Sequence, residues 1–95
     1  MPTEPVRFGT VREVEPQVHE LAHIQYGADL VGVRIVVSRL EDGSWRGRIV
    51  FGSEDLDSAP STGEILVGQS EAELWQSVHE LREYHLRDFY RALTE

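Results

Sequence analysis

The second half of the chain contains three short runs of alternating apolar and polar residues, followed by one long run with helical spacing. Residues 30–40, 45–52 and 64–68 are predicted to be strands because every second residue is apolar. Residues 70–93 have apolar side chains every three or four positions, which predicts one long helix. This order predicts an α+β domain, in which a three- to four-stranded antiparallel sheet packs against the long C-terminal helix.

The alternation within the strands also predicts which side chains are buried. The sequence Asp42-Gly43 indicates a hairpin turn between the first two of these strands. Because successive strand residues point to opposite faces, one face of the sheet would hold the core. The residues expected on this core face are Val31, Val33, Ile35, Val37, Trp45, Gly47, Ile49 and Phe51. The opposite face would carry a stripe of arginines, namely Arg34, Arg46 and Arg48.

The predicted long helix has a clear start, but it is too long for the sheet. Ser70 and Glu73 have the spacing of a capping box, in which each side chain binds the backbone at the other's position. A helix over residues 70–93 would measure roughly 35 Å, whereas short strands span only about 20 Å. Its distal apolar residues would therefore need a partner, either an N-terminal helix or a second subunit, and we expect a homodimer. The expected interface residues are Tyr84, Leu86, Phe89 and Tyr90, together with the arginine stripe.

The first third of the chain allows two interpretations. Residues 1–15 are expected to form an N-terminal arm or an edge strand, and residues 16–27 a short helix with Pro16 in its first turn and Gly27 as its cap. Alternating residues between Val18 and Tyr26 are equally typical of a strand, so both interpretations stay open. Together with the second half of the chain, these segments form a single domain over residues 1–95.

Composition restricts the range of functions. The 95-residue chain has a formal net charge of −8 and no cysteine, which excludes disulfides and thiolate metal sites. The negative charge repels nucleic acid and anionic membranes and favours a basic protein partner. We find neither a signal peptide nor an apolar segment of membrane-spanning length, and so expect a cytoplasmic protein without membrane contact.

One short motif has catalytic character. His19, Glu20 and His23 satisfy the H-E-x-x-H pattern, which on a helix places two imidazoles where they can share a zinc ion. The string resembles zincin metallopeptidases, and this resemblance implies His19 and His23 as ligands and Glu20 as general base. On a strand, however, the two histidines would be about 13 Å apart and could not share an ion. We therefore favour ordinary surface histidines with no cofactor, and keep a zinc-binding, hydrolytic protein as the alternative.

The arginine stripe suggests a third function. Arg34, Arg46 and Arg48 on an uncovered sheet face could bind RNA, but such faces normally also carry aromatic residues for base stacking. None is expected on that face here. Pairing of the arginines with Glu64 or with carboxylates of a partner is the favoured role, and we expect no binding of nucleic acid.

A family resemblance covers about residues 30–86. The hairpin over residues 42–51 and the segment Val67-Gly68-Gln69-Ser70-Glu71-Ala72-Glu73-Leu74 resemble the core of HicB-type antitoxins. In that family a glycine-tryptophan or glycine-tyrosine hairpin precedes a strand and a helix that begins with a similar motif. The same order of elements is similar to the double-stranded-RNA-binding fold. The resemblance implies a non-enzymatic interaction or regulatory module that acts through protein–protein contacts, as antitoxins do.

Overall fold

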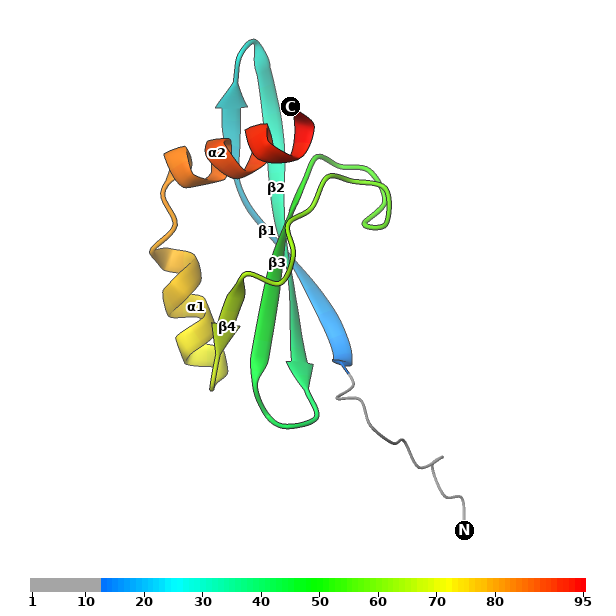
Figure 1. Ribbon diagram of the computed structural model, residues 1–95, viewed down its shortest axis with the longest axis vertical. Helices are drawn as coiled ribbons and strands as arrows, with labels where there is room; N and C mark the ends of the chain where they lie inside the picture. The colour runs from blue at the N-terminus through cyan, green and yellow to red at the C-terminus, as the bar shows by residue number, and fades with distance from the viewer. Residues whose placement is uncertain (1–12) are drawn as a thin grey trace.

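The computed structural model describes residues 13–95, which form one antiparallel sheet and two helices (Figure 1). The strands are β1 (Glu13–Tyr26), β2 (Asp29–Leu40), β3 (Trp45–Phe51) and β4 (Leu66–Gly68), and they lie in the sheet in chain order. The helices are α1 (Glu71–His79) and α2 (Glu83–Thr94). The predicted α+β class and antiparallel sheet are thus confirmed, with a fourth strand supplied by the N-terminal part of the chain.

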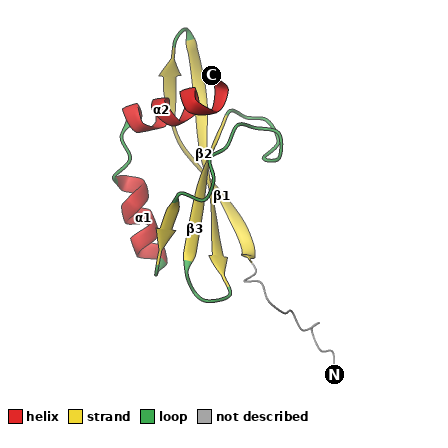
Figure 2. Cartoon of the chain, in the orientation of Figure 1, coloured by secondary structure: helices red, strands yellow, loops and turns green. Residues whose placement is uncertain are grey.

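The predicted short helix over residues 16–27 is wrong. This segment belongs to β1, which forms a long hairpin with β2 through the turn at Gly27 (Figure 2). Of the two patterns in the sequence, the alternation from Val18 to Tyr26 prevailed, because β2 offers a complete strand to pair with. Residues 1–12, which include most of the predicted N-terminal arm, lie outside the described residues.

The predicted long helix is two helices. Ser70 caps α1 as expected: its hydroxyl accepts a hydrogen bond from the Glu73 amide at 3.2 Å, and the Glu73 carboxylate accepts one from the Gln69 amide at 2.9 Å. After His79 the chain extends, and Arg82 becomes the N-cap residue of α2. The break turns the chain so that α2 packs against β1.

The core face is the one that the strand pattern predicts. Every second residue of β2 from Val31 to Val37 is buried against Leu74, Val78 and Leu86 of the helices. α1 lies against β4 and β3, whereas α2 contacts β1 (Figure 1). Gly68 lets α1 approach β4 closely, since a Cβ atom at this position would lie 2.6 Å from the Leu74 nitrogen.

The sequence suggested that the opposite face of the sheet is open. In the structure, the loop between β3 and β4 covers part of it. Ala59 and Leu56 from this loop form a second small apolar cluster with Val36 and Val50. Two of the predicted arginines bind the same loop. Arg34 donates to the Glu54 carbonyl at 2.6 Å, and Arg48 donates to the Ser61 hydroxyl at 3.1 Å.

Candidate functional site

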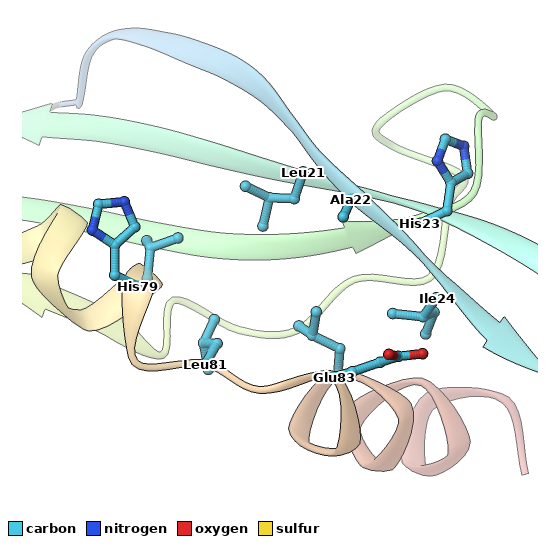
Figure 3. Close-up of a pocket in the computed structure, with 9 residues that line it drawn as sticks. Leu21, Ala22, His23, Ile24, His79, Leu81 and Glu83 are labelled. Carbon is cyan, nitrogen blue, oxygen red and sulfur yellow. The ribbon is translucent and has the colours of Figure 1, made fainter.

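The two histidines of the H-E-x-x-H string lie on opposite faces of the sheet. His19 is on the helix side, where its ring packs edge-on against Trp75 with 4.9 Å between centroids. His23 is on the other side, and its ring lies beside Gly32, with Nε2 3.5 Å from where a Cβ of Gly32 would be. Figure 3 shows His23 directed away from the helices. The alternative interpretation, in which His19 and His23 share one zinc ion, does not fit these positions, and residues 13–95 contain no cluster of three or more metal-binding side chains.

The predicted ion pair between the arginine stripe and Glu64 is absent from the described residues, and pairing with carboxylates of a partner stays a prediction. Arg34 and Arg48 bind the loop as described above, and the Nε atom of Arg46 is buried without a hydrogen-bond partner. The ion pairs in this part of the chain lie along α2, between Arg87 and Glu83 and between Arg91 and Asp88. Arg34 and Arg48 thus fix the loop to the sheet.

The predicted interface residues on the distal helix are divided between the interior and the surface. Leu86 is buried, and the Tyr90 ring contacts the rings of Tyr26 and Phe51 at 4.9 and 5.2 Å. Phe89 is half-buried against the same core, whereas Tyr84 is 56 % exposed. The β1–β2 hairpin therefore covers most of this patch within one chain. The expected homodimer stays a prediction.

Sequence reasoning missed the outer edge of β1. β1 is the first strand of the sheet, and no other strand in the described range pairs with its outer side. The residues Gln17, Val18, Glu20 and Ala22 are exposed along it. The strand alternation in this segment was the available signal, but the helical interpretation concealed it.

The alternation of hydrogen bonds in the sheet shows which backbone N–H and C=O groups of β1 point away from β2. The Gly52 amide donates to the Gly32 carbonyl at 2.8 Å, so the even-numbered residues of β2 bind β3. The odd-numbered residues of β2 then bind β1, and His19 faces one of them. Val18 and Glu20 must therefore direct their backbone N–H and C=O groups outward, which offers a short template for an additional strand.

An apolar groove of about 340 Å³ lies beside this edge. Its walls come from β1 on one side and from the end of α1, the connection after it and the start of α2 on the other (Figure 3). The side chains that line it are Leu21, Ala22, His23, Ile24, Val78, His79, Leu81, Glu83 and Leu86.

A β-bulge gives the groove its shape. Leu21 pairs with Val33 and Ile24 pairs with Val31, so β1 has one residue more than β2 between these two pairs. The additional residue places both Leu21 and Ile24 on the helix side, where strict alternation would have placed only one of them. Both walls therefore present aliphatic surface to the groove.

Two carboxylates, those of Glu20 and Glu83, lie near this edge. The Glu20 carboxylate is exposed and forms no ion pair within the described range, because its cross-strand neighbour Arg34 binds the Glu54 carbonyl instead. Glu83 lines the groove, and its carboxylate is 2.8 Å from Arg87.

Comparisons with known proteins add no identity to this geometry. No family model matches the chain, and neither the curated proteins nor the solved structures contain a significant match. Neither helix of the described part has the length and apolar character needed to cross a membrane.

Proposed function

We propose that this protein is a non-enzymatic interaction module that binds an extended segment of a basic partner protein as a fifth strand on β1. The observation that carries the proposal is that the backbone groups of Val18 and Glu20 point away from β2, have no strand partner among residues 13–95, and lie beside an apolar groove. In strand addition, backbone hydrogen bonds supply affinity and a neighbouring pocket accepts alternate side chains of the ligand. This module has both parts on the same strand.

The basic character of the partner follows from charge complementarity. The chain carries a net charge of −8, and Glu20 on the open edge lacks an ion-pair partner among the described residues. A second copy of the same chain would bring the same negative charge to the contact. Self-pairing is also restricted by the two bulges of β1 and by Pro16, because the longest stretch of β1 in regular register is residues 17–21.

The experiment is a selection of short random peptides, displayed on phage, against the full chain. Enriched peptides should lose binding to Ala22→Trp, which fills the groove, and to Val18→Pro, which removes an outward amide. The control is Val67→Trp at the opposite edge of the sheet, where Val67 is 46 % exposed. Enriched peptides that bind all four proteins equally, or a selection that enriches none, would refute strand addition at β1.

The mass of the protein in solution tests whether a second copy of the chain occupies the β1 edge. We expect sedimentation equilibrium to show no dimer that forms through this edge. A dimer that Val18→Pro dissociates would assign the edge to a second copy and overturn the proposal. A dimer dissociated by Tyr84→Asp but not by Val18→Pro would use α2, as the sequence suggested, and would leave the edge available to a partner.

A further inference from the structure

We infer that the segment bound at β1 carries a basic residue directly next to an aliphatic one, with Glu20 selecting the first and the groove selecting the second. This inference rests on the proposed function, which concerns only the mode of binding. It adds a sequence requirement on the partner and assigns it to named groups on this chain.

The requirement follows from the two faces of β1. Glu20 pairs with Arg34, an even-numbered residue of β2, so its side chain lies on the face away from the helices. Leu21 lies on the helix side and lines the groove. Side chains that are directly opposite in paired strands share a face. The ligand residue opposite Glu20 therefore stands beside a carboxylate, and its neighbour opposite Leu21 points into the groove.

The groove favours an aliphatic side chain in this second position. Leu21, Ile24, Val78, Leu81 and Leu86 form most of its lining. A volume of about 340 Å³ exceeds that of one leucine or methionine side chain, so the groove can hold such a residue without displacing its walls. A charged residue there would lose its hydration without a matched partner, because the Glu83 carboxylate already binds Arg87.

The position opposite Glu20 favours lysine or arginine for a different reason. Arg34, the cross-strand neighbour of Glu20, donates to the Glu54 carbonyl at 2.6 Å and forms no ion pair with the Glu20 carboxylate. An exposed carboxylate at the rim contributes mainly to selectivity, because a like charge opposite it is disfavoured.

The experiment is the same peptide selection, carried out in parallel on the wild type and on Glu20→Arg. The wild type should enrich peptides with a lysine or arginine adjacent to leucine, isoleucine, valine or methionine. Glu20→Arg should enrich an acidic residue at the basic position and keep the aliphatic one. A wild-type peptide should bind Glu20→Arg at least about tenfold more weakly, and its lysine-to-glutamate variant should recover the loss.

A matched control variant distinguishes failure of the sequence requirement from failure of strand addition at β1. Glu64→Arg makes the same charge change at an exposed residue outside the groove and should leave the selected sequences unchanged. If Glu20→Arg enriches the same peptides as the wild type, the sequence requirement is wrong, although loss of binding in Ala22→Trp would still support strand addition. If Ala22→Trp and Val18→Pro bind the enriched peptides normally, both proposals fail together.

Discussion

The two edges of the sheet are built differently. At the β3–β4 edge, β4 pairs with only the first part of β3, and the loop before β4 satisfies the rest. The Phe51 amide donates to the Pro60 carbonyl at 2.9 Å, and the Ile49 amide donates to the Thr62 hydroxyl at 3.0 Å. The β1 edge has no such cover in the described part of the chain, although β1 is twice as long as β3.

This difference indicates where the fold is fixed and where it can accept a partner. α1 joins the β3–β4 edge tightly through Gly68 and Leu74, whereas α2 packs mainly against β1 and leaves a groove beside it. Long unpaired strand edges are usually blunted because they promote aggregation. Here two bulges and Pro16 interrupt the edge, so that its longest regular stretch is residues 17–21, and no other strand within residues 13–95 covers that stretch.

The largest expected effect concerns the core beneath α1, on the side of the β3–β4 edge. Leu74 is fully buried, so Leu74→Ala should lower the free energy of unfolding by about 2–5 kcal/mol. Leu81 lines the groove and is half-buried, and Leu81→Ala should cost only about 1 kcal/mol. Urea unfolding followed by circular dichroism measures both. Equal losses would show that the groove side is packed as firmly as the core beneath α1.

A pair of glycines sharpens the comparison at the backbone. A Cβ atom at Gly68 would lie 2.6 Å from the Leu74 nitrogen, so Gly68→Ala should separate α1 from β4 and cost about 1–3 kcal/mol. At Gly32, on the sheet face away from the helices, the nearest atom would be His23 Nε2 at 3.5 Å, an ordinary contact. Gly32→Ala should leave the thermal unfolding temperature unchanged or slightly raised. A large loss in Gly32→Ala would mean that the His23 ring cannot make room for a side chain at this position.

A proline pair tests which amides of β1 are free. The His19 amide is directed toward β2, so His19→Pro should remove a hydrogen bond, leave a carbonyl unpaired and cost about 1–3 kcal/mol. The Val18 amide is directed outward, and Val18→Pro should cost less than about 1 kcal/mol, since edge strands accept proline there. Thermal unfolding of both variants distinguishes the two amides. The opposite order would reverse the assignment of the outward groups.

The smallest expected effect is a dependence on alkaline pH at the open side. The Tyr26 hydroxyl donates to the Glu95 carboxylate, and this hydrogen bond raises the pKa of Tyr26 above its ordinary value near 10. A raised pKa in the folded state stabilises the fold below the ordinary value, and this contribution is lost as the pH rises through the folded-state pKa. The unfolding temperature should therefore fall more steeply above about pH 10 in the wild type than in Tyr26→Phe. Identical slopes would exclude a role of this contact in holding the end of α2.

Part of the candidate site was accessible from the sequence. Glu20, His19 and His23 were identified as a group, but for a shared metal ion that required a helix. The strand places His19 against Trp75 and His23 beside Gly32, on opposite faces. The order of residues from Val18 to Tyr26 fits either a helix or a strand. Only the pairing of this segment with β2 decides between the two.

The sequence by itself determined the core face of β2 and β3 and the start of α1. Every second residue of β2 from Val31 to Val37 is apolar, and these side chains all lie on the same face, which is therefore the core face. The start of α1 follows from local residues, because Ser70 and Glu73 supply the capping groups themselves.

Only the tertiary structure decided the break between α1 and α2. No glycine or proline stands between Glu80 and Arg82, and the helical spacing continues through them. The helix ends there because Leu86 and Tyr90 can be buried only if the chain turns back to the β1–β2 hairpin. The same turn creates the groove beside β1, since its second wall comes from the connection and the start of α2. Local propensity cannot indicate either feature, because both depend on apolar surface that distant segments provide.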